Sequence, residues 1–315
     1  MKIISVNDMA ADTLFGGAEY NCAAVLAELQ AQGHEVEDHG MRHTGDGVTI
    51  EAHLPNPQEL DADILMLGQF NVIDPRWLLT AMQHSKARVV LWLHTLPWCR
   101  NYSGACGGAV DPSHAGCRVP LYWEMIRRAD TVLCYSPAQA NAALRVFGGL
   151  GQFDKYRILP IFCDSAAEFY AHRNDEKAPG SVLSVARHCD AKGALAYCLF
   201  AATNAHHLGP FRAVGTYKPG IRERYEQHGI ECIDRVPLED LPAMLGASEY
   251  FYHQPPQLDT GPRTIVEARL AGCKLITSCQ CGYQGHPLWE MSDEELVARC
   301  MTAPKSAAKA VIAGA

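Results

Sequence analysis

Short apolar runs alternate with helix-forming segments along almost the whole chain, and this alternation restricts the fold more than any other feature of the sequence. Strands that alternate with helices form βαβ units, in which parallel strands build a sheet with helices on both faces. The pattern therefore predicts an α/β fold with a doubly wound parallel sheet. In the first half, the strand-like runs are KIISV (2–6), DILMLGQF (63–70), RVVLWLH (88–94), TVLCYS (131–136) and RILPIF (157–162), with helix-like segments at 18–32, 75–84, 120–128 and 137–147.

The alternation is interrupted at AHRNDEKAPGS (171–181), a polar segment whose Pro-Gly pair is typical of a linker. It restarts with strand-like runs at 181–187, 211–215, 231–236, 249–255 and 274–278, and with helix-like segments at 192–207, 221–229, 238–246 and 263–271. A chain of 315 residues suffices for two domains. We expect Rossmann-like domains over 1–170 and 181–290, facing each other across a ligand-binding cleft. Helices are expected over 291–315, the last at 304–313, and the sequence leaves open whether they cross back to the first domain.

The composition argues against membrane-spanning and disulfide-rich proteins. No apolar run approaches the ~20 residues of a membrane helix, and MKIISVNDMAAD lacks the hydrophobic region of a signal peptide, so we expect a cytoplasmic protein. The thirteen cysteines predict buried free thiols, because they are scattered singly through apparent core segments. A dinucleotide-binding fingerprint is also missing, since LFGGAEYN carries only the pair Gly16–Gly17 after the first strand.

The charge is unevenly distributed. A net charge of −8 argues against a general nucleic-acid binder. Residues 76–128 nevertheless hold seven basic residues against Asp111 and Glu124. A solvated face is the plainer interpretation of this stretch, and a docking site for an anionic acceptor is the alternative.

The segment QLDTGPRTIVEARLAGCKLITS (257–278) carries the strongest functional signal. Gly261 allows close approach of a ligand, and Pro262 suits the first position of a helix whose free amides can bind a phosphate, with Arg263 adding charge. The carboxylates of Asp259 and Glu267 would repel phosphate, so we expect each to accept hydrogen bonds from a sugar. Together these features predict a nucleotide-sugar site. The alternative is that Thr264 and Glu267 form a capping box that only starts the helix.

Two other segments support a diphosphate site. SVLSVARHCDAKGALAYCLFAA (181–202) places Arg187 at a strand end and Lys192 before a helix, where both cations could hold a diphosphate. Gly16 and Gly17 precede the helix at 18–32 and could supply further backbone donors. Either signal alone is weak, since basic residues at strand ends are usually just solvated.

Several motifs in the same order resemble the retaining glycosyltransferases of family 4, which have the GT-B fold. DTGPRTIVEA (259–268) resembles the family's Glu-x7-Glu motif, and GCKLITS (272–278) resembles the run that follows it. ARHCDAKG (186–193) resembles Gly-Arg-x4-Lys-Gly, and GGAE (16–19) resembles the N-terminal Gly-Gly-x-Glu. The resemblance covers nearly the whole chain. It implies that the first domain binds the acceptor and the second binds the nucleotide sugar.

The resemblance also implies roles for single residues. Glu267 would bind the donor ribose, and Asp259 the sugar hydroxyls. Arg187 and Lys192 would neutralise the diphosphate. The remaining predicted contacts are the backbone of Gly261, Pro262, Arg263 and Thr264, the pair Gly16 and Gly17, and His94 in the sugar pocket. The sequence departs from the family motif at Thr260 and Pro262, and Asp259 is one methylene shorter than the usual glutamate.

No cofactor is expected, and the donor is expected to be a UDP- or GDP-sugar. The resemblance suggests that the acceptor hydroxyl attacks on the leaving-group face and passes its proton to a donor phosphate oxygen. The acceptor stays open between a glycan, a lipid, a small molecule and a modified base in DNA. A non-catalytic nucleotide-sugar-binding protein is the rival in a different class.

Two possible metal sites are weak. Asp61 and Asp63 form an Asp-x-Asp pattern, but Asp63 leads directly into a core strand. The loop HTLPWCRNYSGACGGAVDPSHAGC (94–117) offers four zinc ligands whose spacing matches no tight zinc motif, namely Cys99, Cys106, His114 and Cys117. We therefore predict no metal and interpret the loop as a free-thiol loop on the acceptor side, with a metal site or a disulfide within 99–117 as the alternative.

Overall fold

The structure is a computed structural model that divides into two compact units. Unit 1 comprises Met1–Phe162 and Thr302–Ala315, and unit 2 comprises Cys163–Met301. The residues described are 1–11, 17–43, 50–68, 73–94, 96, 119–147, 153–283 and 285–313. None of the helices within these ranges is long and apolar enough to cross a lipid bilayer.

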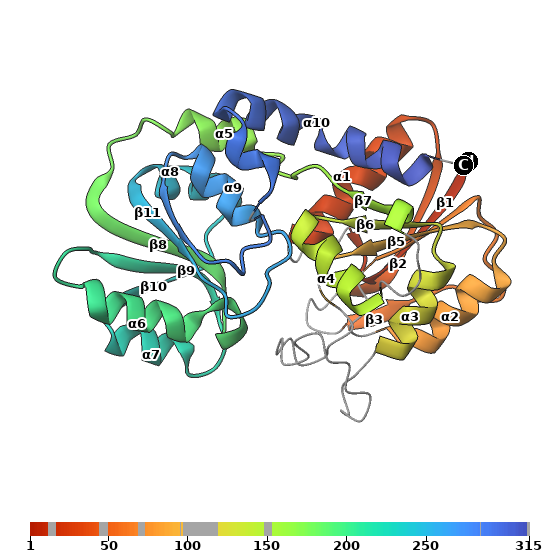
Figure 1. The fold of residues 1–315 in the computed structure, drawn as a ribbon, viewed down its shortest axis with the longest axis horizontal. Helices are drawn as coiled ribbons and strands as arrows, with labels where there is room; N and C mark the ends of the chain where they lie inside the picture. Colours follow the sequence, from red (N-terminus) through yellow and green to blue (C-terminus); the bar gives the residue numbers. More distant parts are fainter. Residues whose placement is uncertain are drawn as a thin grey trace. The chain divides into compact units, whose positions relative to one another are not determined.

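Unit 1 is built on a seven-stranded sheet in the order β3-β2-β1-β4-β5-β6-β7 (Figure 1). All neighbouring strands run parallel except β2 and β3, which are antiparallel. The strands are β1 (Lys2–Met9), β2 (Glu35–His43), β3 (Ile50–His53), β4 (Ile64–Leu67), β5 (Arg88–Leu93), β6 (Thr131–Cys134) and β7 (Tyr156–Ile158). The helices are α1 (Gly17–Ala31), α2 (Pro75–His84), α3 (Val119–Arg128) and α4 (Pro137–Phe147).

Strand β4 shows how this sheet is covered on both faces. Leu65 and Leu67 pack in a core cluster with α2, α3 and α4. Ile64 and Met66 point to the opposite face and pack with α1 and the end of α10 (Asp293–Ile312). Successive strand residues alternate between faces, so a strand buried on both sides must be apolar throughout. This explains the run ILML and confirms the predicted doubly wound sheet.

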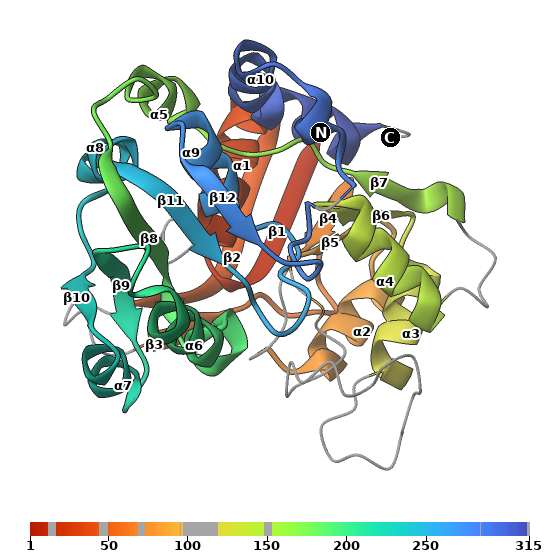
Figure 2. The ribbon, with the colours of Figure 1, turned by 60° about the vertical axis from the view of Figure 1, so that its left-hand side comes forward.

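Unit 2 repeats the plan with a parallel five-stranded sheet in the order β10-β9-β8-β11-β12. Helices α6 and α7 lie on one face, and α5, α8 and α9 lie on the other (Figure 2). The strands are β8 (Ala178–His188), β9 (Phe211–Tyr217), β10 (Ile230–Asp234), β11 (Ser248–His253) and β12 (Lys274–Thr277). The helices are α5 (Ala166–Ala171), α6 (Ala194–Asn204), α7 (Ile221–Gln227), α8 (Leu241–Gly246) and α9 (Arg263–Leu270).

The last helix is longer than the sequence analysis predicted. It was expected at 304–313, but α10 runs from Asp293 to Ile312 with Pro304 inside. An interior proline removes one intrahelical hydrogen bond. The helix continues through it along a fully buried stripe formed by Leu296, Cys300, Ala303, Ala307 and Val311. Its last turns belong to the core of unit 1.

The ten cysteines that the structure describes are all free, as predicted. Seven of them are buried, namely Cys22, Cys134, Cys163, Cys198, Cys273, Cys281 and Cys300. The exceptions to burial are Cys189 and Cys232, which are half-buried, and Cys279, which is exposed. Buried thiols of this kind pack as small apolar side chains.

Candidate functional site

The carboxyl edge of the unit 2 sheet gathers most of the residues that the sequence singled out. Strand β8 ends at His188, one residue after Arg187, and β11 ends at His253. Asp259 and the start of α9 follow β11 along the chain. Because the carboxyl ends of parallel strands share one edge, these side chains belong to one region of unit 2.

Lys192, Asp259 and His253 form one cluster at this edge. The Nζ atom of Lys192 donates to Oδ2 of Asp259 at 2.6 Å, and Nε2 of His253 lies 3.1 Å from the same oxygen. Burial acts to raise the pKa of Asp259, but the charge of Lys192 and the contact with His253 outweigh it and hold the pKa well below its usual range. Asp259 is therefore ionised at neutral pH although only 14% of its side chain is exposed.

A glycine brings Lys192 to this cluster. Gly193 follows Lys192 in a left-handed conformation, with φ of 85°, and α6 begins immediately after it. A Cβ atom at Gly193 would lie 2.3 Å from the carbonyl oxygen of Gln254, the residue after His253. Only glycine fits a place that combines a positive φ with so close a backbone contact. The Lys-Gly sequence thus sets the Lys192 segment against the end of β11.

A neighbouring loop holds the backbone of Asp259. Its amide donates to the carbonyl oxygen of Gln280 at 2.9 Å, and its carbonyl accepts from the amide of Gly282 at 2.7 Å. A Cβ atom at Gly282 would lie 2.3 Å from the carbonyl oxygens of both Asp259 and Thr260. These bonds fix the Asp259 backbone, so its carboxylate is presented from a rigid position.

Helix α9 begins at Arg263, and its charged residues pair with each other. The Nε atom of Arg263 donates to Oε1 of Glu267 at 2.5 Å, and its Nη2 lies 2.7 Å from Oδ1 of Asp164. Burial raises the pKa of Glu267, which is 2% exposed, while Arg263 partly opposes that rise. Burial opposes the charge of Arg263, but Glu267 and its other anionic neighbours raise the pKa of Arg263 overall.

The capping-box alternative does not hold. The N-cap residue of α9 is Pro262, its side chain makes no capping bond, and Thr264 lies inside the helix. Glu267 instead turns to Arg263, one helical turn earlier. Proline at this place carries no side-chain acceptor for the first amides of α9. Gly261 and Thr264 beside it are half-buried.

Arg187 differs from Lys192 and Arg263, whose side chains are both paired. Arg187 is exposed, and its side chain has no hydrogen-bond or ion-pair partner within the described ranges. Its neighbour Ala186 lies against Gly215 of β9, which has φ of 142° and whose Cβ atom would lie 1.9 Å from the Ala186 carbonyl oxygen. An unpaired guanidinium at a strand end is available to an anionic ligand.

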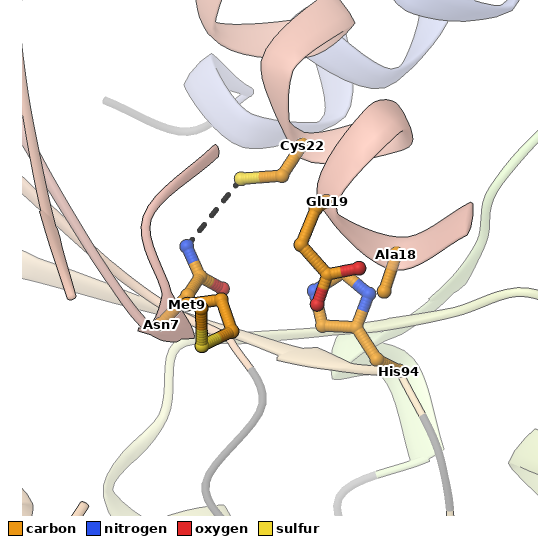
Figure 3. A pocket seen from close by; sticks show the side chains of 6 residues that line it. All are labelled: Asn7, Met9, Ala18, Glu19, Cys22 and His94. Atoms are coloured by element: carbon orange, nitrogen blue, oxygen red, sulfur yellow. Dashed lines mark hydrogen bonds between the residues drawn. The ribbon is translucent and has the colours of Figure 1, made fainter. Parts of the chain in front are cut away.

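In unit 1, His94 lines a pocket with residues from β1 and α1, and Gly17 is the exposed first residue of α1 (Figure 3). The Nδ1 atom of His94 is hydrogen-bonded to the Tyr135 hydroxyl at 2.6 Å. Gln139 bridges their two strand ends, accepting from the Tyr135 amide and donating to the Leu93 carbonyl. Burial lowers the pKa of His94 to about 3, so the imidazole is neutral. The pocket is lined by Asn7, Met9, Ala18, Glu19, Cys22 and His94.

Several predictions fall on residues outside the described ranges. These are Gly16 and the four candidate zinc ligands Cys99, Cys106, His114 and Cys117. Within the described ranges, no group of three or more metal-ligating side chains gathers. Asp63 of the Asp-x-Asp pattern accepts the Lys2 amide at Oδ2, at 2.7 Å, which supports its structural interpretation.

The cations of the basic stretch at 76–128 are largely engaged within unit 1. Arg76 pairs with Asp74, and both Arg127 and Arg128 pair with Glu124. Arg88 donates to the Val311 carbonyl and to the Thr131 hydroxyl. These contacts favour the plainer interpretation of the stretch, in which its charges serve local pairing.

Sequence reasoning missed His253 and Asp164 as members of these clusters. His253 ends the apolar run EYFYH just as His94 ends VVLWLH, so its place at a strand end was a usable signal. Asp164 gives no such signal, because it reaches Arg263 from a place 99 residues earlier in the chain. Contacts between residues this far apart in the sequence are set by the fold.

No protein-family model matches the chain, and no curated protein matches its sequence. Solved structures do match over nearly the full length. WaaG, a glycosyltransferase involved in lipopolysaccharide biosynthesis, is 13% identical with a TM-score of 0.59, covering 100% of both chains. Anabaena HepE in complex with UDP-glucose is 15% identical with a TM-score of 0.59, covering 98% of this chain and 94% of HepE.

A third match is an alpha-glucosyltransferase in complex with UDP and a 13-mer DNA. It is 12% identical with a TM-score of 0.54, covering 99% of this chain and 94% of that one. At these identities the likeness concerns the fold. The chain has the GT-B fold of these neighbours, with two Rossmann-like α/β units.

Proposed function

We propose that this chain is a retaining glycosyltransferase of the family 4 type, which transfers a sugar from a nucleotide diphosphate to an acceptor hydroxyl. The observation that carries the proposal is the cluster of Lys192, Asp259 and His253 at the carboxyl edge of unit 2. It combines a cation suited to phosphate with an ionised carboxylate suited to sugar hydroxyls. The GT-B fold and the motif resemblance support the same activity.

In the proposed site, Lys192 and Arg187 bind the donor diphosphate. Arg187 is exposed and unpaired within the described ranges, so it can meet the phosphate without breaking an existing contact. Lys192 now binds Asp259, so a phosphate would compete for it. The first amides of α9, with the backbone of Gly261, add donors for the same charge. Positive groups already in place stabilise the leaving diphosphate in the transition state.

Asp259 has one oxygen to offer the donor sugar. Both of its contacts in the cluster use Oδ2, and within the described ranges Oδ1 has no partner. Because the carboxylate is ionised, Oδ1 can accept a hydrogen bond from a sugar hydroxyl. Glu267 is similar, since Oε1 binds Arg263 and Oε2 is left for a ribose hydroxyl. His94, neutral and buried beside the pocket of unit 1, is proposed to line the sugar or acceptor side.

We take a UDP-hexose as the first donor to test, because HepE binds UDP-glucose in a matching fold. A GDP-sugar is the next candidate. No cofactor is required in this mechanism, because the acceptor proton can pass to a donor phosphate oxygen. Cytoplasmic nucleotide sugars would supply the donor. The acceptor is proposed to be a glycan, a lipid or a small molecule.

Two alternatives remain as proposals. The match to a DNA-bound alpha-glucosyltransferase motivates a modified base in DNA as acceptor. The net charge of −8 and the paired cations of residues 76–128 weigh against it. A non-catalytic nucleotide-sugar-binding protein is motivated by the shorter Asp259 in place of glutamate.

The test is a thermal-shift screen against UDP-, GDP-, ADP- and dTDP-sugars, followed by donor hydrolysis without acceptor. A ligand at 100 times its Kd adds about 2.7 kcal/mol to the free energy of unfolding, which a thermal shift detects readily. Slow release of free sugar with the binding donor would support an enzyme. Binding without hydrolysis or transfer would support the non-catalytic alternative, and no shift with any nucleotide sugar would refute the proposal.

A further inference from the structure

His253 is a buried histidine whose Nε2 atom faces the proposed site. Its side chain is 4% exposed at the end of β11, and Nε2 lies 3.1 Å from Oδ2 of Asp259. This contact does not meet the geometry of a hydrogen bond, and among the described residues Nε2 has no other hydrogen-bond partner. Buried polar atoms in this condition are uncommon in native proteins.

A second buried histidine of unit 2 shows the contrast. His188 is 2% exposed, and both of its ring nitrogens are bonded, Nδ1 to the Tyr225 hydroxyl and Nε2 to the Val214 carbonyl, each at 3.1 Å. His188 is thus fully satisfied within the core of unit 2. The Nε2 atom of His253 instead meets only the carboxylate of Asp259 among the described residues.

Donor binding would change the partners of Asp259. In the structure, Lys192 and His253 both approach its Oδ2 atom. A diphosphate that takes Lys192 would leave a mostly buried carboxylate without its cation, which is costly. His253 cannot follow the phosphate, because its side chain is enclosed at the end of a strand. It would therefore become the remaining side-chain contact of Oδ2.

We propose that His253 is a positioning residue, which holds Oδ2 of Asp259 while Lys192 turns to the donor diphosphate and so keeps Oδ1 directed at the donor sugar. This role rests on the proposed function. His253 itself touches neither the phosphate nor the sugar in this scheme. Removing the His253 side chain should therefore weaken binding of the donor sugar and leave binding of the nucleotide largely unchanged.

The first experiment needs no ligand. Urea unfolding is measured for the wild type, His253→Leu, Asp259→Asn and the double variant. If the two side chains interact, the midpoint shift caused by His253→Leu should be clearly smaller in the Asp259→Asn background. His286→Leu is the matched control, because His286 is also buried in unit 2 but caps Leu288. Its shift should be the same in both backgrounds.

The second experiment measures the Kd of UDP and of UDP-glucose by calorimetry for the same proteins. We expect His253→Leu to weaken UDP-glucose binding about tenfold more than UDP binding, a loss that disappears in the Asp259→Asn background. His253→Gln should restore part of the difference, because its amide can donate from a similar position. A purely structural role would weaken both ligands equally.

The outcomes separate this role from the proposed function. Additive midpoint shifts, or equal losses for UDP and UDP-glucose, would overturn the positioning role while the transferase proposal stands. If the wild type binds no nucleotide sugar, the proposed function falls and the positioning role falls with it. Coupled shifts together with a sugar-specific loss support both.

Discussion

At the scale of single residues, Asp259 keeps its charge in a mostly buried place because its neighbours replace the solvent. Lys192 supplies the opposite charge and His253 a second contact, and together they outweigh the cost of burial. Its folded pKa is depressed, so its contribution to stability is present above the unfolded value, near 4, and is lost as the pH falls further. Asp259 is thus ready to act as an acceptor throughout the neutral range.

Replacing Lys192 with alanine should lower the transfer rate sharply. The variant removes the cation proposed to stabilise the leaving diphosphate, and single electrostatic groups of this kind contribute about 100-fold or more to turnover. Initial rates of sugar transfer, or of donor hydrolysis, measure the effect. Lys274→Ala is the matched control, because Lys274 also forms an ion pair, 2.7 Å from Glu249, but on an exposed surface. Near-native activity of Lys192→Ala would refute the assignment.

His94 makes unfolding depend on pH in a predictable direction. Burial depresses its folded pKa to about 3, below the ordinary value near 6.5. Below pH 6.5 the unfolded chain therefore binds a proton that the folded protein refuses, and stability falls as the pH drops. At pH 5 this group should remove about 2 kcal/mol of the stability present at pH 7.

Urea unfolding of His94→Gln at both pH values tests this. The loss between pH 7 and pH 5 should shrink by about 2 kcal/mol relative to the wild type. Tyr135→Phe serves as control, because it removes the hydrogen-bond partner of His94 but keeps the imidazole. It should lower stability while retaining most of the pH-dependent loss. An unchanged loss in His94→Gln would contradict the assignment.

The sequence alone identified Asp259 and Lys192 but assigned them to different parts of a ligand. Their mutual contact could not be foreseen, since they lie 67 residues apart and meet only through the fold. The same holds for Arg263, which was expected to add charge for phosphate and instead bonds Glu267 and Asp164. Residue types and spacing reveal which groups are available. Partners between distant segments depend on packing.

At the scale of elements, most helices and strands could be predicted because their apolar patterns are strong. The helices at 75–84 and 137–147 were predicted to the residue. β2 was missed, since EVEDHGMRH is too polar to resemble a core strand. Near the edge of the sheet a strand can be polar, so composition gave no signal. α10 was predicted only from residue 304, whereas it begins at Asp293 and continues through Pro304.

Gly193 links element geometry to the site, and its replacement by alanine should be strongly destabilising. The new Cβ atom would enter a left-handed position and lie 2.3 Å from the Gln254 carbonyl oxygen. Gly220→Ala is a close control, because Gly220 has φ of 77° at the start of α7 but nothing within 4 Å of its Cβ position. The control should cost about 1 kcal/mol from backbone strain alone.

Gly193→Ala should cost about 1–3 kcal/mol more than the control, since the overlap forces the backbone to shift. It should also weaken UDP-glucose binding, because the shift displaces Lys192 from Asp259. Urea unfolding and calorimetry measure the two effects. Equal stability losses for the two variants would show that the close contact with Gln254 adds nothing to the cost of the Gly193→Ala substitution.

At the scale of the whole molecule, the two units share one architecture, with parallel strands and helices on both sheet faces. The alternation of short apolar runs and helices predicted this plan because strands buried on both faces must be apolar throughout. Where the chain passes between the units was harder to foresee, since α10 begins in unit 2 and ends in the core of unit 1. Only the packing of α10 shows that one helix belongs to both units.

The overall charge leads to a prediction about the acceptor. A net charge of −8 repels a polyanion, and within unit 1 four of the seven basic residues at 76–128 are engaged in local contacts. A protein that grips DNA through several phosphates loses affinity steeply with salt, by a slope of roughly 0.9 per phosphate contact in log units. We therefore expect no measurable binding to a duplex carrying hydroxymethylated bases, even at low salt.

Fluorescence anisotropy with labelled hydroxymethylated and unmodified duplexes, at 50 and 200 mM salt, measures that binding. Sugar transfer to the same DNA is followed in parallel with the donor found in the thermal-shift screen. Tight binding whose affinity falls steeply between the two salt concentrations, together with transfer to the modified duplex, would establish DNA as the acceptor. A steep salt dependence would also mean that several cations bind DNA phosphates. The paired arginines of unit 1 could do so only by breaking their ion pairs, so other cations, such as Arg187, would have to reach the nucleic acid.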